Sequence, residues 1–148
     1  MASAVLFSWL LDELEGRRHE LRVRACGYGI GQPRPADAFE DGALNAILDY
    51  RFDPDERLHW YFDHHRTAFA DDAERAVFDR RVATGRYFYD GARSSCTKLI
   101  TDVAREKFGL AAPQLSELVA WADKIDTASF ASAEEAIDRS EPVMRLTT

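Results

Sequence analysis

Hydrophobic residues recur near the start of the chain first at the helical period and then at the strand period. Residues 3–16 carry apolar side chains every three or four positions and end at Gly16, which predicts a helix with a glycine C-cap. Residues 21–26 alternate apolar and polar side chains, which predicts a strand. The glycines and prolines within residues 27–35 are typical of a turn that ends such a strand.

Two short apolar runs follow, and each leads directly into charged or imidazole side chains. Residues 43–48 predict a buried strand that ends at Asp49, and residues 58–62 predict a second strand that ends at Asp63. The polar residues 51–57 connect the two. Because open α/β sheets bind ligands at the carboxyl ends of their strands, this pattern places the candidate chemistry at one edge of the sheet.

The rest of the chain has the pattern of helices. Apolar spacing and capping residues predict helices over 69–82, 95–108, 113–124 and 133–139. Strands followed by helices indicate the α/β class, with a mainly parallel sheet flanked by helices. A length of 148 residues fits a single domain with one hydrophobic core.

Composition narrows the class of protein. The net charge of −7 argues against nonspecific binding to duplex DNA, which relies on clustered lysine and arginine. No apolar run reaches the roughly 20 residues that span a bilayer, and no basic segment of a signal peptide opens the chain, so we expect a cytoplasmic protein without a membrane partner. Cys26 and Cys96 lack a metal-binding spacing and are expected to be buried thiols.

The strongest candidate chemistry is the run Asp63, His64 and His65. Neutral imidazole is the commonest side-chain metal ligand, and a carboxylate often orients it. Neighbouring histidines on a regular strand face opposite ways, but where a strand ends the chain turns and both can reach one cleft. An isolated histidine pair is weak evidence, whereas one that follows an apolar strand and a carboxylate indicates a site.

Three more aspartates are candidate ligands. Asp49 ends the neighbouring strand, where it fits either a metal ligand or a helix cap. Asp123 and Asp126 are three residues apart and share a face if the helix continues. Taken alone, these two are better explained by solvation and capping at the helix end than by metal binding.

These residues together resemble the DHH phosphoesterase superfamily. Residues 61–65 resemble its Asp-His-His motif, Asp49 resembles the aspartate that bridges two metal ions, and Asp126 resembles a later aspartate ligand, with Asp123 as the less favoured match. Residues 94–97 look like the hydroxyl-rich helix start that follows the family motif. The resemblance spans about residues 3–140 of the chain. The superfamily includes exonucleases, oligoribonucleases, cyclic-dinucleotide phosphodiesterases and pyrophosphatases.

The resemblance implies a metal-dependent hydrolase of phosphodiesters or phosphoanhydrides. It implies that Asp49, His64 and Asp126 bind Mn²⁺ or Mg²⁺, and that His65 contacts metal or phosphate while Asp63 orients the imidazoles. The hydroxyls expected to meet the substrate phosphate are those of Ser94, Ser95 and Thr97. The implied substrates are small phosphorylated compounds, nucleotides or short oligonucleotides, and the implied mechanism uses two metal ions.

Two departures from the family shape the expectations. Residues 1–148 match a partial DHH domain without the family's first strand, which carries Asp-x-Asp, and without its C-terminal substrate-binding domain. We therefore expect at most one tightly bound Mn²⁺ per chain, very slow hydrolysis, and self-association through an exposed sheet edge. The alternatives are an inactive binding or scaffold module and a mononuclear metal-binding domain.

Overall fold

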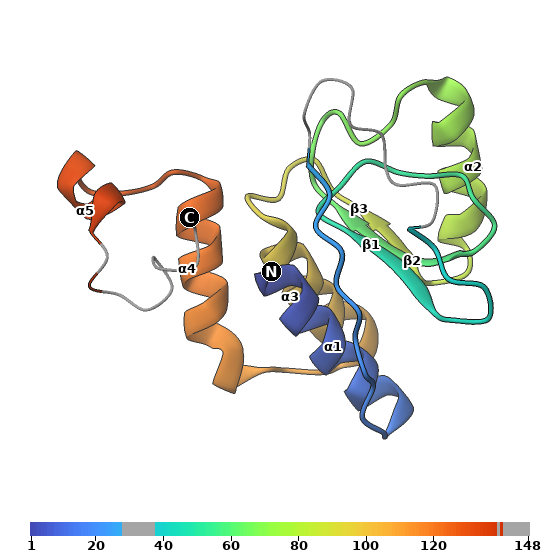
Figure 1. The fold of residues 1–148 in the computed structure, drawn as a ribbon, viewed down its shortest axis with the longest axis horizontal. Helices are drawn as coiled ribbons and strands as arrows, with labels where there is room; N and C mark the ends of the chain where they lie inside the picture. The colour runs from blue at the N-terminus through green and yellow to red at the C-terminus, as the bar shows by residue number, and fades with distance from the viewer. Residues whose placement is uncertain (28–37, 139, 141–148) are drawn as a thin grey trace.

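The computed structural model describes residues 1–27, 38–138 and 140. Their strands form one three-stranded parallel sheet in the order β1–β2–β3, with helices on both sides (Figure 1). The strands are β1 Asn45–Leu48, β2 Leu58–Asp63 and β3 Tyr87–Tyr89. The helices are α1 Ala2–Glu15, α2 Asp72–Val82, α3 Cys96–Phe108, α4 Ser116–Asp126 and α5 Ala133–Ile137, with a 3-10 turn η1 at Pro113–Leu115. The predicted α/β class with a parallel sheet and flanking helices is confirmed.

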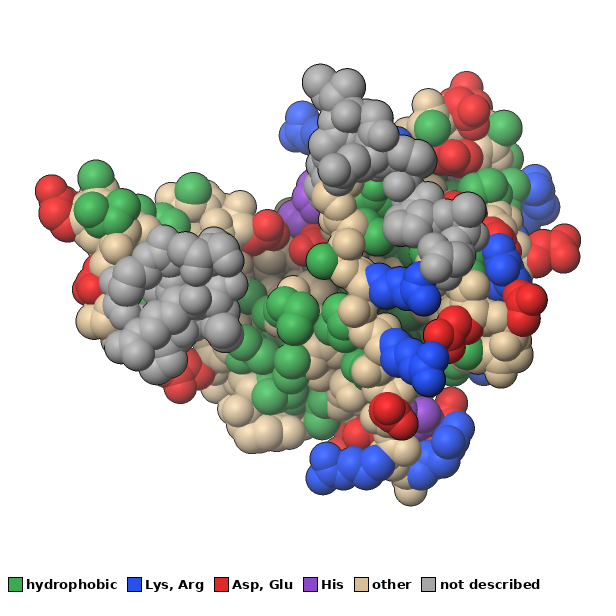
Figure 2. All heavy atoms as spheres, viewed as in Figure 1, with side chains coloured by type: hydrophobic (Ala, Val, Ile, Leu, Met, Phe, Trp, Pro, Cys, Tyr) green, Lys and Arg blue, Asp and Glu red, His purple; other side chains and the backbone are tan. Residues whose placement is uncertain are grey.

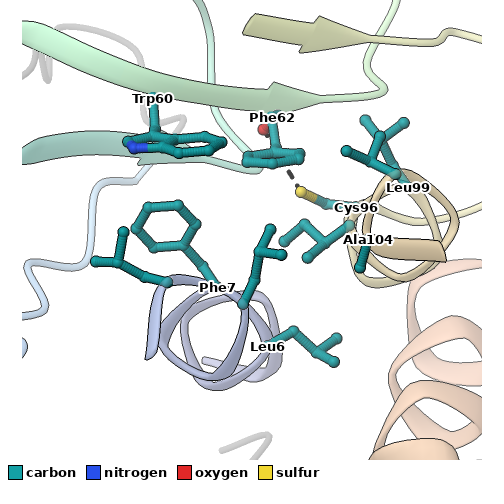
Figure 3. Close-up of a cluster of buried hydrophobic side chains, with 11 residues drawn as sticks. Leu6, Phe7, Trp60, Phe62, Cys96, Leu99 and Ala104 are labelled. Atoms are coloured by element: carbon teal, nitrogen blue, oxygen red, sulfur yellow. Dashed lines mark hydrogen bonds between the residues drawn. The ribbon is translucent and has the colours of Figure 1, made fainter. Parts of the chain in front are cut away.

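The central strand β2 is buried on both faces, as strands of parallel sheets usually are. Trp60 and Phe62 point toward α1 and α3, and the ring of Phe7 in α1 packs edge-on against both of theirs (Figure 3). Phe62 is fully buried, so truncating such an aromatic ring to alanine costs about 3–5 kcal/mol. This packing holds the carboxyl end of β2 in place.

The opposite face of β2 carries a second aromatic cluster. Tyr61 lies edge-on to Phe52, with ring centroids 5.2 Å apart, and Phe78 of α2 closes the cluster at 5.8 Å from Tyr61. The side chains of Tyr61 and Trp60 therefore serve different cores although they are neighbours, which is the alternation expected of a strand. Both cores meet at β2.

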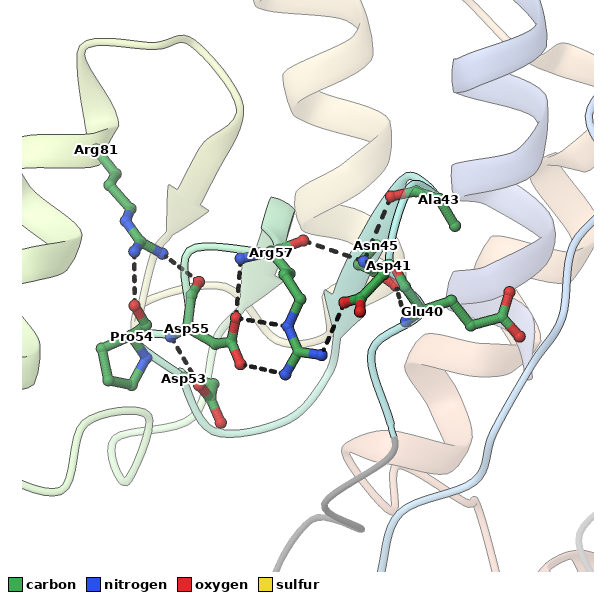
Figure 4. A network of polar contacts seen from close by, with 9 residues as sticks. All are labelled: Glu40, Asp41, Ala43, Asn45, Asp53, Pro54, Asp55, Arg57 and Arg81. Carbon is green, nitrogen blue, oxygen red and sulfur yellow. Dashed lines mark hydrogen bonds and ion pairs between the residues drawn. The ribbon is translucent and has the colours of Figure 1, made fainter.

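The connection 49–57 between the parallel strands β1 and β2 is short, since such crossovers usually take about a dozen residues or more. Polar contacts rather than a helix order it (Figure 4). Arg57 pairs with Asp55 at 2.7 Å and with Asp41 at 3.2 Å, while Arg81 donates to the carbonyl groups of Pro54 and Asp55 at 2.6 and 3.0 Å. The bonds from Arg81 satisfy two loop carbonyl groups that a crossover helix would otherwise satisfy internally.

The strand predicted over residues 21–26 is wrong, because these residues form no strand in the described chain. Leu21 and Val23, the apolar half of the alternation, remain 37% and 51% exposed. An alternating pattern stabilises a strand only where one face is buried and a neighbour pairs with its backbone. The turn predicted over 27–35 lies, from residue 28 onward, outside the described residues.

Other boundaries differ in smaller ways. β3 was not predicted because three residues are too few to show a period. The helix predicted over 113–124 divides into η1 and α4, and α4 continues to Asp126. Both cysteines are free thiols, but only Cys96 is buried, so the expectation for Cys26 is corrected to partial burial. Among the helices in the described ranges, none is long and apolar enough to cross a membrane.

Candidate metal centre

Asp49 follows β1 in a backbone conformation that few side chains tolerate. Its φ of 60° lies in the left-handed region, which costs most residues roughly 1–2 kcal/mol and is tolerated best by glycine, asparagine and aspartate. Its N–H donates to the carbonyl of Phe62 at 2.9 Å, which extends the pairing of β1 with β2 by one residue. This arrangement turns the chain immediately beside the end of β2, where His64 follows. Backbone strain of this kind is common at functional sites.

His64 presents one ring nitrogen to two carboxylates. Its Nδ1 lies 3.1 Å from the carbonyl oxygen of Arg93, and since a carbonyl only accepts, Nδ1 carries the proton. In the neutral ring, Nε2 is then unprotonated and carries a lone pair. It lies 3.4 Å from Asp49 Oδ1 and 3.2 Å from Asp126 Oδ2, and it is buried without a hydrogen bond. A lone pair facing carboxylate oxygens is the arrangement that a shared cation stabilises.

His65 is oriented by the buried carboxylate of Asp63. Nδ1 of His65 lies 2.7 Å from Asp63 Oδ1, and the hydroxyl of Tyr61 donates to the other oxygen of Asp63 at 3.2 Å. Burial lowers the pKa of His65, but the hydrogen bond to Asp63 and the charges of Asp63, Asp49 and Asp126 outweigh it and raise that pKa above its usual value. Asp63 itself is fully buried, so it acts on the imidazole and cannot reach solvent.

Asp49, His64 and His65 form a group that could hold a metal ion, with one ligand atom from each lying within 4.8 Å of the others. Asp126, the last residue of α4, lies beside this group, with its Oδ2 3.2 Å from Nε2 of His64. Burial and the charge of Asp49 raise the pKa of Asp126, and the histidines only partly offset this. A set of imidazole nitrogens and carboxylate oxygens suits a borderline or hard divalent ion such as Mn²⁺. Figure 2 shows histidine and acidic side chains gathered at one end of a hollow between α4 and the sheet.

Asp123 does not lie in this group. Its Oδ1 accepts a hydrogen bond from Ser94 Oγ at 2.5 Å, and its Oδ2 lies 2.8 Å from Lys98 Nζ. Of the two aspartates that the sequence left open as ligands, the one beside His64 is Asp126. Because α4 runs to Asp126, both project from the same helical face but meet different partners.

The three hydroxyls expected to contact a phosphate differ in their burial and in their partners. Ser95 caps α3 by accepting from Lys98 N at 3.3 Å, as predicted for this helix start, and it bonds Thr97 at 3.0 Å. The side chains of Ser95 and Thr97 are buried, and a role for their hydroxyls in binding a substrate phosphate stays a prediction. Ser94 is only partly buried and stays the accessible hydroxyl.

Two participants were not identified from the sequence. The carbonyl of Arg93 sets the tautomer of His64, but a backbone atom leaves no residue-type signature. Lys98 neutralises Asp123, and its place four residues after Ser94, one turn along α3, is a signal that could have been read.

Protein-family models, curated proteins and solved structures were each compared with this chain, and none of them matches it. The geometry of the described residues is therefore the basis for assigning function.

Proposed function

We propose that this chain is a divalent-metal-dependent phosphoester hydrolase in which Asp49, His64 and Asp126 hold the ion. The observation that carries the proposal is the buried Nε2 of His64, which makes no hydrogen bond and faces a carboxylate oxygen from each of two different elements. Buried polar atoms in proteins are nearly always bonded. A cation at this point would bind all three side chains and offset the crowded negative charge.

The chain's own residues fit hydrolysis of a phosphate ester. A bound divalent ion supplies Lewis acidity and lowers the pKa of a coordinated water. His65 has its Nδ1 proton directed at Asp63, which leaves Nε2 as the basic nitrogen that can accept a proton or contact a phosphate oxygen. The N-terminus of α3 begins close to Arg93, the partner of His64, and helix N-termini attract phosphate.

The sequence resemblance supports the same class of reaction. The order of Asp49, the Asp63–His65 run, Ser94 and Asp126 resembles that of the DHH superfamily, which hydrolyses phosphodiesters and phosphoanhydrides with Mn²⁺ or Mg²⁺. We therefore propose a small phosphorylated substrate, such as a nucleotide or a short oligonucleotide.

A second candidate function is metal binding without turnover. Within the described ranges, Asp49, His64 and His65 are the one group of at least three potential ligands whose atoms lie within 4.8 Å of one another, which supports a single ion per chain. A two-metal mechanism needs ligands for a second ion a few ångströms away. Hydrolysis by one ion is expected to be slow, and a mononuclear binding module would share every contact described above.

Calorimetric titration with Mn²⁺, followed by an assay with bis-p-nitrophenyl phosphate, separates these functions. We expect one Mn²⁺ per chain in the wild type and none in His64→Gln or Asp49→Asn. His59→Gln is the matched control, because the Nδ1 of His59 accepts a backbone hydrogen bond from Asn45 at 3.1 Å and glutamine retains an acceptor. Turnover that is lost in His64→Gln supports the hydrolase, binding without turnover supports the module, and a wild type that binds no divalent ion refutes both.

A further inference from the structure

Helix α4 brings Asp126 to the candidate metal centre although it has little apolar attachment to the rest of the molecule. None of its side chains is fully buried, and Val119 is only partly buried against the core formed by α1, β2 and α3. Apolar contacts of this kind hold a helix near a surface but specify its rotation and its axial position weakly. A carboxylate at its last residue needs a more specific constraint to stay within 3.2 Å of His64.

Asp123 supplies such a constraint at the first turn of α3. Its two carboxylate oxygens are held by different partners, Oδ1 by Ser94 at 2.5 Å and Oδ2 by Lys98 at 2.8 Å. The side chain of Asp123 is 18% exposed and that of Lys98 48%, so water screens this pair in part, mainly from the side of Lys98. Burial raises the pKa of Asp123, but the bonds from Lys98, Ser94 and Ser95 outweigh it, so the carboxyl stays charged.

Because Asp123 and Asp126 lie in the same helix, the bonds that hold Asp123 also position Asp126. Asp123 and Asp126 are three residues apart in one continuous helix, so they share a face and are separated by ~4.5 Å along its axis. Two bonds to one carboxylate fix both the rotation of α4 and its axial position against α3. Asp126 is then directed at Nε2 of His64.

We propose that Ser94, Asp123 and Lys98 form a clamp that positions Asp126 at the metal centre, with Asp123 as a positioning residue and not a ligand. The inference rests on the proposed function only for the identity of what Asp126 binds. The positioning of α4 is a property of the metal-free chain and is tested separately from metal binding.

The first experiment measures amide hydrogen exchange in the metal-free chain. In Lys98→Met and Asp123→Asn, amides of residues 118–126 should exchange about tenfold faster than in the wild type, because α4 loses its polar attachment. Amides of α1 should be unchanged. Lys107→Met is the matched control, since Lys107 is exposed at the other end of α3. Equal exchange of α4 in the wild type and both clamp variants would overturn the proposal, whether or not the chain binds metal.

The second experiment uses charge reversal and a spectroscopic signature. Lys98→Glu and Asp123→Lys should each weaken Mn²⁺ binding about tenfold, and the double variant should recover most of the loss because the ion pair re-forms in reverse. The absorption spectrum of bound Co²⁺ in Asp123→Asn should shift toward that of Asp126→Asn, since both variants would lose the Asp126 ligand. Unchanged affinity in both single variants, or a double variant no better than either, would count against the clamp.

Discussion

The carbonyl of Arg93 decides which nitrogen of His64 faces the candidate metal centre. By accepting from Nδ1 at 3.1 Å, it leaves Nε2 toward Asp49 and Asp126. The convergence of Asp49 and His64 was predictable from sequence, because both follow apolar strands whose carboxyl ends meet. The resemblance favoured Asp126 over Asp123, but helical spacing alone does not decide between them, because the choice depends on where α4 ends and how it is rotated.

Substitutions at Asp49 should separate charge from backbone conformation. Asp49→Asn removes the charge but keeps a side chain that tolerates the left-handed φ of 60°. Asp49→Ala removes the charge and also replaces aspartate with a residue that tolerates this φ poorly. We expect all Asp49 variants to lose Mn²⁺ binding, and only Asp49→Ala to lose about 1 kcal/mol of unfolding free energy as well. Urea denaturation measures the difference, with Asp49→Gly as the control for φ. A stable Asp49→Ala would show that the conformation is not strained.

A second prediction at this scale concerns the effect of Asp63 on His65. The hydrogen bond and charge of Asp63 outweigh burial and raise the pKa of His65. Asp63→Asn should therefore lower that pKa, so that His65 is protonated over a narrower range at low pH. NMR titration of the imidazole resonances in the metal-free chain measures the shift. A pKa of His65 that stays unchanged in Asp63→Asn would contradict the assigned hydrogen bond.

At the scale of elements, the sequence predicts a helix or strand where the hydrophobic period repeats over enough residues, or where capping residues mark its ends. The helix α3 was predicted nearly in full because Ser95 and Gly109 mark its ends. The three-residue strand β3 carried no such signal. Residues 21–26 have the alternation of a strand but pair with no strand in the described ranges, because pairing depends on the fold rather than on the local sequence.

The end of α1 is fixed by a histidine between two carboxylates. Nδ1 of His19 lies 2.8 Å from Asp12 and Nε2 lies 2.9 Å from Glu15, so the protonated ring bridges both after the chain reverses at Gly16. Hydrogen bonds to Asp12 and Glu15 raise the pKa of His19, while their bonds to His19 lower the pKa of each carboxyl.

The stability contributed by this bridge should depend on pH in both directions. A raised histidine pKa stabilises the fold below the unfolded value of about 6.5, and the contribution is lost as the pH rises through the folded pKa. The lowered pKa values of Asp12 and Glu15 mean that the carboxylates stabilise the fold above their unfolded pKa values. This contribution is lost in acid, as the pH falls through the folded pKa values and the carboxylates are protonated. The Tm deficit of His19→Gln should therefore be largest at about pH 5 to 6 and smallest at about pH 9. A deficit independent of pH would show that packing, not charge, accounts for the role of His19.

At the scale of the whole molecule, the candidate centre joins the end of α4 to the carboxyl ends of β1 and β2, two strands that already pair with each other. Asp49 follows β1, His64 and His65 follow β2, and Asp126 ends α4. The sheet and its two aromatic cores place the first three. Polar contacts at the first turn of α3 and at His64, together with the partial burial of Val119 against the core, bring α4 to them. An ion held at this junction would therefore stabilise the arrangement of elements and not merely the local loops.

Metal binding should accordingly raise global stability by mass action. At a free Mn²⁺ concentration of about 100 times Kd, a single site specific to the folded chain adds about 2.7 kcal/mol to the unfolding free energy. Differential scanning calorimetry should show Tm rising with Mn²⁺ in the wild type and in His59→Gln, and remaining constant in His64→Gln. Asp126→Asn should show an intermediate rise, because Asp49 and the histidines remain while the link to α4 is lost. If Mn²⁺ raised the Tm of His64→Gln as much as that of the wild type, the ion would bind elsewhere on this acidic chain. The contacts between α4 and the strand ends would then form without a metal ion at the candidate centre.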